Sequence, residues 1–456
     1  MNRLHHLLIR PLWLAVAALS VAPGCSTPHS GYDRGIDAWD AVVEELPEGL
    51  PQALGDSSTL SDQLIWARFY NPAVRAAAHR WRSALEQVPQ SSGLPDPRLT
   101  FGYFIDEVET RTGPMDWRLG VSQRFPWFGS LDLAGQVAVD MAEVARERWL
   151  AARQAVSLEV RTGWYELAYL DAAIDVTRGH RDLMISWESV ARTRYATALG
   201  SDADVIRAQV ELGKLDDRLR SLEDLKRPLS ARLNGALNRP AGAPLPTTTL
   251  EHGGVDAARL EILGLAESLD HSSPELRARS WAIEAAEQQL RLADKQFYPD
   301  FSLGLDYTNV GSARGPGVSG SGDDVLAITT GISLPLRRGQ LNSAKRQAQA
   351  QKAAAQADWR AAHNRMSAEL ELGLYSVRDA ERRITLYLNT LVPKGQQSIS
   401  STTVAYQAGD ASFLDLIDAE RVLLEFQLAT ARARADHAQA LATVEQLTGR
   451  DLGLED

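Results

Sequence analysis

Two carboxylates three residues apart, Asp415 and Asp418, are the side chains of this sequence whose type and spacing best fit a chemical role. They lie in the stretch SFLDLIDAE at 412–420, where a helical pattern would put both on one face. Carboxylates gathered in one place favour cations and repel one another when they are ionised. From the residues alone, the pair is typical of a solvated helix face, because Asp near a helix N-terminus stabilises the helix dipole.

Outside this stretch, the sequence offers no set of catalytic or cofactor-binding residues. It contains no P-loop, no HExxH motif, no GxSxG elbow and a single Cys. Its nine His residues are scattered, and we interpret His180, His363 and His437 as surface or packing residues of helices. The carboxylate pairs at 106–107 and 323–324 fall at the ends of predicted hairpins. The sequence therefore predicts no enzyme, no catalytic residue, no cofactor and no metal site.

Composition and charge exclude one class of partner. The chain has 456 residues, is 44% hydrophobic and carries a formal net charge of −11, so it has enough apolar residues for a real core but no basic excess. Because nucleic-acid binding depends on neutralising phosphates with Lys and Arg, we expect no nucleic-acid partner.

The N-terminal residues have the pattern of an export signal. Arg3 and Arg10 precede an apolar stretch, Leu12–Val21, which is followed by Cys25, the only cysteine. A lone Cys at this boundary resembles a lipoprotein signal, in which residues 1–24 are removed and the thiol of Cys25 is acylated. The alternative is a secreted chain with one unpaired thiol. Beyond the signal, no apolar run reaches the roughly 18 residues that a membrane-spanning helix needs.

Two very long helices dominate the remaining pattern. Apolar and small residues recur every 3.6 positions on average between Ala138 and Ile174, which predicts a helix from about 131 to 197, roughly 100 Å long at ~1.5 Å per residue. A second long helix, rich in Ala, is predicted from Ser343 to about 406, with one proline at Pro393. Shorter helices are predicted near 60–88, 204–237, 256–296 and 411–447.

Four short segments alternate with period two, which predicts strands paired in two hairpins. In each of them one face is apolar and the other is small, polar or charged, as in RLTFGYFI and DFSLGLDY. An ordinary sheet with one wet face explains any single strand. A lipid-facing wall explains all four, because a chain made otherwise of helical rods gives a small sheet little to pack against. The predicted strands are near 98–105, 117–125, 300–307 and 325–334.

The chain is an internal duplication. Tyr195 and Tyr406 are 211 residues apart, as are Asp204 and Asp415. Each half runs short helix, hairpin, very long helix, tight turn and helix. The predicted organisation is a signal peptide at 1–24, a tethering segment at 25–59, a first repeat at 60–240 with its tip near 198–203, a linker at 241–255, a second repeat at 256–449 with its tip near 408–413, and a tail at 450–456.

This ordered and duplicated set of short motifs resembles the TolC-like outer-membrane efflux proteins over nearly all of the mature chain. The motifs are NPAVRAA and SPELRAR at the start of the halves, LPDPRLTFGY and FYPDFSLGL entering the strands, FPWFGSL and LPLRRGQ leaving them, and RYATALGSDADVIRAQ and AYQAGDASFLDLIDAE at the turns.

The resemblance implies a fold and a set of partners. The fold is mainly α with a small β part, a duplicated helix–hairpin–long helix–helix unit. Three chains form a twelve-stranded transmembrane β-barrel, continued by a periplasmic α-helical barrel, because four strands cannot close a pore. The expected partners are two further copies of the chain, a periplasmic adaptor protein, an inner-membrane pump of the RND type and outer-membrane lipid. The expected location is the outer membrane, with a lipid anchor.

The resemblance also implies roles for the two turns, which become periplasmic tips. In the family's second-half motif, two Asp residues line the constricted entrance, and they correspond here to a gate of Asp415 and Asp418. Because Ala198 stands where the second turn has Gly409, we expect a different loop geometry at the first tip. The family's basic residue after the tip glycine is absent here. The residues expected at the tips, in docking and packing, are Tyr195, Gly200, Asp204, Tyr406 and Gly409.

We therefore expect a passive, trimeric exit duct of a tripartite efflux system for drugs or metal ions. The alternatives are the duct of a type I secretion system and a coiled-coil structural lipoprotein of the cell envelope. An adaptor protein is disfavoured, because it would show one helical hairpin rather than two.

Overall fold

The computed structural model describes residues 30–44, 53–55, 57–246, 248, 260, 263–450 and 452. The predicted signal peptide and Cys25 lie outside these residues. The described chain forms two compact units, between which the chain passes several times. The first unit comprises the residues up to Asp40, Trp81–Ala145 and Arg279–Asp358, and the second comprises Ala41–Arg80, Arg146–Ala278 and the residues from Trp359 onward.

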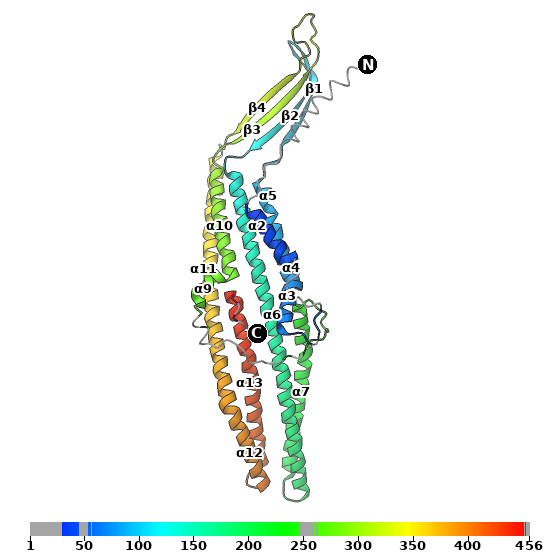
Figure 1. The fold of residues 1–456 in the computed structure, drawn as a ribbon, viewed down its shortest axis with the longest axis vertical. Helices are drawn as coiled ribbons and strands as arrows, with labels where there is room; N and C mark the ends of the chain where they lie inside the picture. The colour runs from blue at the N-terminus through cyan, green and yellow to red at the C-terminus, as the bar shows by residue number, and fades with distance from the viewer. Residues whose placement is uncertain are drawn as a thin grey trace. The chain divides into compact units, whose positions relative to one another are not determined.

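The first unit contains the four predicted strands as one antiparallel sheet in the order β1-β2-β3-β4 (Figure 1). The register sets Phe101 opposite Leu119, Leu119 opposite Tyr307 and Tyr307 opposite Leu326, so apolar residues of all four strands share one face. The first hairpin is longer than predicted and places the carboxylates at 106–107 within a strand. The strands are β1 (Arg98–Thr110), β2 (Gly113–Phe125), β3 (Asp300–Val310) and β4 (Val325–Ser333).

The apolar face of the sheet is exposed. Side chains on β1 and β4, such as Phe101 at 65% and Ile328 at 75% exposure, carry no covering layer from the described chain. On the opposite face, the hydroxyl of Thr329 donates to the carboxylate of Asp306 at 2.9 Å. At the junction of the sheet with the helices, the ring of Trp127 stacks on Tyr298 with centroids 4.9 Å apart. The alternation of apolar and polar faces predicted from sequence is therefore present.

The helices follow the predicted order with two kinds of correction. The first long helix, α6, spans Ser130–Ala196 as predicted. The second long segment is interrupted: α11 ends at Leu386, a π-helical turn covers Tyr387–Leu391, and α12 runs from Val392 to Ala408. Pro393 explains the interruption, because it lacks an N–H and its ring clashes with the carbonyl four residues earlier.

The shorter predicted helices are divided at prolines. Pro72 and Pro274 each begin a new helix, since proline favours the first helical position. Within the part of the chain that the structure describes, every helix is too short or too polar to span a bilayer. The remaining helices are α2 (Ser30–Trp39), η1 (Asp40–Glu44), α3 (Leu60–Tyr70), α4 (Pro72–Leu85), α5 (Gln87–Ser92), α7 (Asp202–Ala236), α9 (Leu265–Ser272), α10 (Pro274–Lys295), α11 (Arg338–Leu386) and α13 (Phe413–Thr448).

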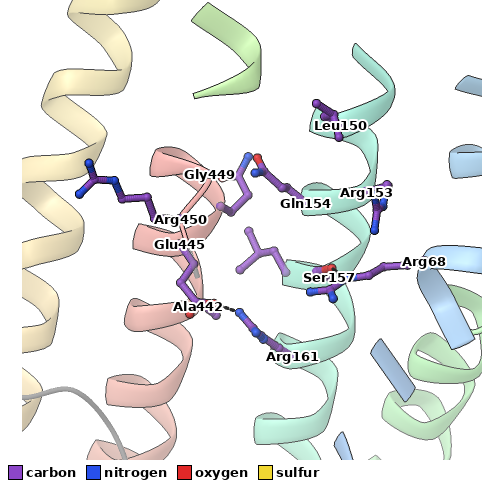
Figure 2. A pocket seen from close by; sticks show the side chains of 12 residues that line it. Arg68, Leu150, Arg153, Gln154, Ser157, Arg161, Ala442, Glu445, Gly449 and Arg450 are labelled. Carbon is purple, nitrogen blue, oxygen red and sulfur yellow. Dashed lines mark hydrogen bonds and ion pairs between the residues drawn. The ribbon is translucent and has the colours of Figure 1, made fainter. Parts of the chain in front are cut away.

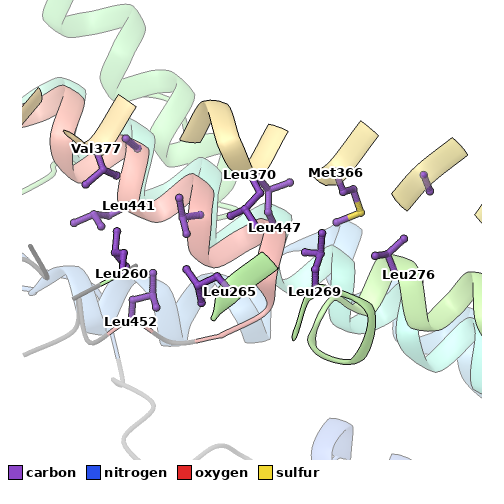
Figure 3. Close-up of a cluster of buried hydrophobic side chains, with 13 residues drawn as sticks. Leu260, Leu265, Leu269, Leu276, Met366, Leu370, Val377, Leu441, Leu447 and Leu452 are labelled. Atoms are coloured by element: carbon purple, nitrogen blue, oxygen red, sulfur yellow. The ribbon is translucent and has the colours of Figure 1, made fainter. Parts of the chain in front are cut away.

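Apolar clusters hold the second unit together, and two of them position the helices described below. One lies between α9, α11 and α13, where Leu269, Leu370 and Leu441 are each at most 1% exposed (Figure 3). Full burial of each such side chain contributes about 1.5–3 kcal/mol. The other cluster lies between two helical hairpins, α6–α7 and α12–α13. It includes Trp187 of α6, Leu416 of α13 and residues of α7 and α12.

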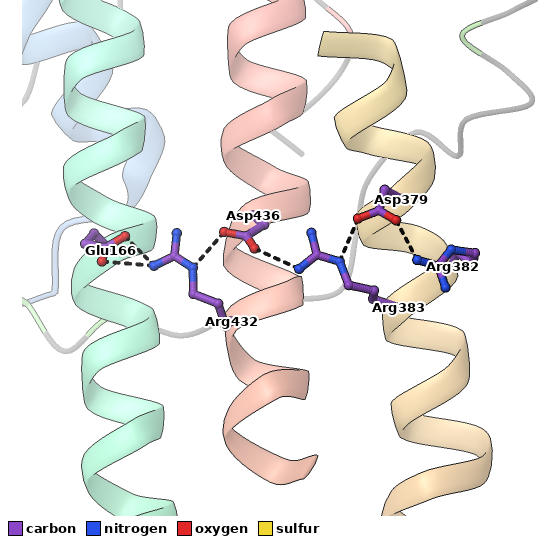
Figure 4. A network of polar contacts seen from close by, with 6 residues as sticks. All are labelled: Glu166, Asp379, Arg382, Arg383, Arg432 and Asp436. Carbon is purple, nitrogen blue, oxygen red and sulfur yellow. Dashed lines mark hydrogen bonds and ion pairs between the residues drawn. The ribbon is translucent and has the colours of Figure 1, made fainter. Parts of the chain in front are cut away.

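A chain of ion pairs crosses three helices of the same unit (Figure 4). Arg432 of α13 contacts both carboxylate oxygens of Glu166 on α6, at 3.0 and 2.8 Å. Its Nε contacts Asp436 at 2.7 Å, and Asp436 in turn lies 3.5 Å from Arg383 of α11. These pairs fix the lateral order α6, α13, α11 in this unit.

Candidate functional site

The turn between α12 and α13 contains a glycine that the backbone conformation requires. Gly409 follows the last residue of α12 with a φ of 90°, in the left-handed region that glycine adopts without strain. The N–H of Asp410 donates to the carbonyl of Ala405 at 2.8 Å, and the N–H of Gly409 donates to Tyr406 at 3.2 Å. This is the Schellman arrangement, which satisfies the last carbonyls of the helix.

Asp415 has a structural task at the start of α13. Its backbone N–H donates to the Ser412 hydroxyl at 3.2 Å, and its carboxylate accepts the Ser412 N–H at 2.9 Å and the Ser412 O–H at 2.7 Å. This reciprocal pair is a capping box, which satisfies the first backbone donors of the helix. The hydrogen bonds from Ser412 lower the pKa of Asp415 below its ordinary value. The carboxylate is exposed and remains ionised at neutral pH.

Asp418 lies one turn further along the same exposed face. Its side chain is 60% exposed and lies 3.4 Å from Arg421. Arg421 also contacts Glu211 of α7, with Nε and Oε2 3.2 Å apart. Burial disfavours the charged form of Glu211, but hydrogen bonds from Arg421 and Lys214 hold its pKa below its ordinary value. The structure thus places both predicted gate carboxylates on the surface of one chain, and Arg421 joins Asp418 to the neighbouring hairpin.

The first long helix ends in the same turn as α12, so the difference expected from Ala198 is wrong for this part of the tip. Ala198 takes a φ of 61°, the conformation of Gly409, 211 residues later. The N–H of Leu199 donates to the carbonyl of Arg194 at 2.8 Å, and that of Ala198 donates to Tyr195 at 3.0 Å, which repeats the Schellman pattern. Gly200 allows close packing, because a Cβ there would lie 2.9 Å from Cβ of Arg194.

Arg194 connects the two tips, and sequence patterns gave no sign of this contact. Its Nη1 donates to the carbonyl of Tyr406 at 2.5 Å and lies 3.4 Å from that of Gln407. Its Nη2 lies 3.4 Å from the carbonyl of Leu199 in its own turn. The guanidinium also stacks over the Tyr406 ring, 4.8 Å from the centroid. One side chain of α6 therefore binds the C-terminal end of α12, where cations favour the helix dipole.

The two equivalent tyrosines have different surroundings. Tyr195 is 51% exposed, whereas Tyr406 is 5% exposed and its ring lies 5.4 Å from that of Phe413. Burial, together with the charge of Asp204, raises the pKa of Tyr406. Within one chain Tyr406 packs between the hairpins, and only Tyr195 of the pair presents its ring at the surface. Asp204 itself pairs with Arg207 at 3.3 Å.

A buried polar contact also joins the hairpins. His180 of α6 is 5% exposed; its Nδ1 lies 2.8 Å from Oε1 of Glu420, and its Nε2 lies 2.8 Å from Oε1 of Gln427. The interpretation of His180 as a packing residue fits this position. The sequence feature that indicates a polar contact here is the spacing of Glu420 and Gln427, which lie two turns apart on one face of a helix. Among the described residues, no group of three or more His, Cys, Asp and Glu side chains could hold a metal ion.

Comparisons with known proteins agree with this architecture. Residues 265–450 match the family model described as outer membrane efflux protein. The chain is 24% identical to the cobalt-zinc-cadmium resistance protein CzcC of Cupriavidus metallidurans, over 97% of this chain and 99% of that protein. It is 21% identical to the outer membrane protein TolC of Vibrio cholerae, over 89% of this chain and 95% of that protein.

Solved structures share the fold. The crystal structure of the outer membrane protein VceC of Vibrio cholerae superposes with a TM-score of 0.71 at 21% identity and covers 86% of this chain and 96% of its own. The open state of the MtrE outer membrane channel of Neisseria gonorrhoeae gives a TM-score of 0.71 at 17% identity, over 90% and 97% of the two chains. Residues 265–450 thus match the outer membrane efflux protein family, and the described chain shares the fold of these outer-membrane channels.

Proposed function

We propose that this protein is the outer-membrane channel subunit of a tripartite efflux system, a passive exit duct for substrates delivered by an inner-membrane pump and a periplasmic adaptor. The observation that carries this proposal is the combination of two packed helical hairpins with a sheet whose apolar face is uncovered. On β1 and β4 the Phe, Leu and Ile side chains of this face are more than half exposed, which is the outer wall expected of strands that contact lipid.

The functional unit is a homotrimer. The sheet of one chain has four strands, and a pore needs more strands than this to close. Three copies supply an even-numbered barrel with room for an aqueous channel. Each subunit is anchored to outer-membrane lipid through Cys25, which lies outside the described residues, and the hairpins extend into the periplasm.

Metal ions are the substrate class that the comparisons favour. Similarity to the cobalt-zinc-cadmium resistance protein extends over 97% of this chain and 99% of that protein. In this role the adaptor binds the tips at Tyr195 and its neighbours, and the pump is of the RND type.

Export can be tested in the native host. Cells that lack the gene are exposed separately to Co²⁺, Zn²⁺ and Cd²⁺ and to a panel of lipophilic drugs, and retained metal is measured by mass spectrometry. We expect the deletion to raise retained metal and the wild-type gene to reverse the effect. If the deletion leaves retained metal unchanged and raises retained drug, drugs rather than metal ions are the substrate class. If the deletion instead abolishes secretion of a protein, the duct of a type I secretion system is favoured.

The carboxylates Asp415 and Asp418 form the gate in this proposal. Three subunits bring six carboxylates to the inner mouth, and such a ring attracts divalent cations and repels itself when ionised. Asn is the informative replacement at position 415, because it keeps an acceptor for the Ser412 cap, whereas Ala removes the cap along with the charge.

We expect the double replacement Asp415→Asn and Asp418→Asn to abolish block by Mg²⁺ added on the periplasmic side. The matched control is Asp182→Asn, whose side chain is 75% exposed on α6 and lies outside the tip. Block that is unchanged in the double variant, or lost equally in the control, would contradict a gate at these carboxylates.

A further inference from the structure

Polar contacts join α6 to α13 at several levels of the second unit. Two of them are arginine–carboxylate pairs, and another pairs a histidine with a carboxylate. They are Arg161 with Glu445 (Figure 2), Glu166 with Arg432 (Figure 4) and His180 with Glu420. Arginine is always charged, whereas histidine changes its charge between about pH 5 and 8. Of these three contacts, the histidine contact is therefore the one that a change of pH near neutrality can alter.

The contact between His180 and Glu420 is enclosed. The two residues are 5% and 1% exposed. One turn further along the same helices, Met184 and Leu424 are buried in the apolar cluster between the hairpins. Because an isolated charge is costly in such surroundings, the Glu420 carboxylate must either face a positive charge or carry a proton itself.

Both nitrogens of the ring face oxygen atoms. Nδ1 lies 2.8 Å from Oε1 of Glu420, and Nε2 lies 2.8 Å from Oε1 of Gln427. A neutral imidazole has one N–H, so both hydrogen bonds form only when the ring is doubly protonated or when Glu420 is itself protonated and donates to Nδ1. A Gln427 amide turned over could donate to a neutral ring, but the buried carboxylate would still lack an opposite charge. The arrangement therefore holds one proton more than an ionised Glu420 beside a neutral ring.

Other charged groups on the packed helices have partners of their own. The arginine that follows each residue of the pair in the sequence contacts a carboxylate of α7: Arg181 donates to Asp216 at 2.6 Å, and Arg421 lies 3.2 Å from Glu211. The charged residue of α12 is Lys394, which is exposed. In the part of the chain that the structure describes, the imidazole is thus the group that hydrogen-bonds the Glu420 carboxylate.

We propose that the contact of His180 with Glu420 is a proton-linked switch: it holds α13 against α6 while the pair keeps its extra proton, and it weakens when that proton is lost. Glu420 follows Asp418 by two residues, so the contact fixes the turns of α13 that carry the predicted gate carboxylates. Its consequence for the gate rests on the proposed channel function, whereas the contact itself is a property of one chain and can be tested separately.

The contact should open more readily as pH rises. When the helices separate, a solvated histidine gives up its extra proton above about pH 6.5, while a solvated glutamate stays ionised. Because the closed contact keeps that proton, each pH unit above about 6.5 raises the equilibrium constant for opening up to about tenfold. The stabilisation is therefore fully present just below about pH 6.5, and it is lost as pH rises to the point where the closed contact also gives up its proton.

Hydrogen exchange of the purified full-length protein in detergent tests this switch without requiring a channel. Peptides covering 175–185 and 416–428 are followed between about pH 6 and 9, and each rate is divided by the intrinsic rate at that pH. At the acidic end, we expect the wild type to be protected about tenfold or more better than His180→Gln, which cannot carry the proton. This difference should shrink as pH rises.

Two further variants separate the switch from a merely structural role. Glu420→Gln replaces the carboxylate with an uncharged amide of the same shape, so protection should no longer fall above about pH 6.5; it carries the test if His180→Gln does not fold. The matched control is His363→Gln on α11, whose ring lies 3.2 Å from Asp270 with both side chains partly exposed; it should respond to pH as the wild type does. A difference between wild type and His180→Gln that is the same at both ends of the pH range, a wild-type pH response in Glu420→Gln, or loss of the response in His363→Gln would overturn the proposal.

Discussion

Replacing Arg194 with Met is expected to uncouple the two helical tips without unfolding the protein. Arg194 is the side chain of α6 that donates to the carbonyls of Tyr406 and Gln407 at the end of α12 and covers the Tyr406 ring. Methionine keeps much of the aliphatic stem of arginine. The substitution therefore removes the hydrogen bonds and the charge while it changes the packing little.

The size of the effect follows from these contacts. The 2.5 Å hydrogen bond from Nη1 to Tyr406 is a charged one, worth about 1.5–3 kcal/mol. The stacking over the ring contributes about 0.5–1 kcal/mol at a partly exposed site, and the contacts at 3.4 Å contribute less. Allowing for solvent at the tip, we expect the local opening free energy of the second turn to fall by about 2 kcal/mol. This change raises the equilibrium constant for local opening about 30-fold.

Hydrogen exchange measured by mass spectrometry reports this opening directly. Peptides covering 404–412 should exchange about 30-fold faster in Arg194→Met, while peptides from the middle of α7 should not change. The control is Tyr406→Phe, which removes a buried hydroxyl without a hydrogen-bond partner among the described residues; it should not accelerate exchange. Unchanged exchange at 404–412 in Arg194→Met, or equal acceleration in Tyr406→Phe, would contradict the role of Arg194 in holding the second turn.

Four further predictions concern helix ends. Ser412→Ala should cost about 1 kcal/mol at the start of α13, seen as faster exchange in its first turn. Because hydrogen bonds from Ser412 lower the pKa of Asp415, their stabilisation is present above the unfolded pKa of about 4 and is lost as pH falls through the lower folded pKa; protection in that turn that is independent of pH between about 5 and 2 would contradict this. Gly449→Ala should lower Tm, because φ is 68° and a Cβ would lie 2.5 Å from the carbonyl oxygen of Ser272; an unchanged Tm would contradict it. Ala198→Gly should relieve a left-handed residue and raise the stability of the first tip by less than about 1 kcal/mol; a clear loss of stability would count against the loop geometry.

Much of the fold follows from periodicity. The 3.6-residue spacing between Ala138 and Ile174 predicts a helix that the structure places at Ser130–Ala196, because a long amphipathic pattern leaves few alternatives. The four alternating segments likewise predict the sheet, though not the extension of the first hairpin. The π-helical turn at Tyr387–Leu391 could not be predicted from the hydrophobic pattern, because one proline can kink a helix, end it or widen a single turn.

The site was less accessible to sequence reasoning, because its contacts join residues far apart in the chain. The duplication located both tips, but it could not show that Ala198 takes the conformation of Gly409, because non-glycine residues rarely do. It also treated Tyr195 and Tyr406 as equivalent, whereas packing between the hairpins buries only Tyr406. The contacts of Arg194 and the pairing of His180 with Glu420 each depend on how the helices pack, which no local motif encodes.

Channel formation by this chain is tested most directly by single-channel conductance. The purified full-length protein is inserted into a planar lipid bilayer, and Mg²⁺ is added to each side in turn. We expect discrete conductance steps from a trimer and block by Mg²⁺ from one side only. Protein that is folded and isolated from the outer membrane, yet gives no steps in the bilayer, would contradict the channel and favour a structural lipoprotein of the cell envelope.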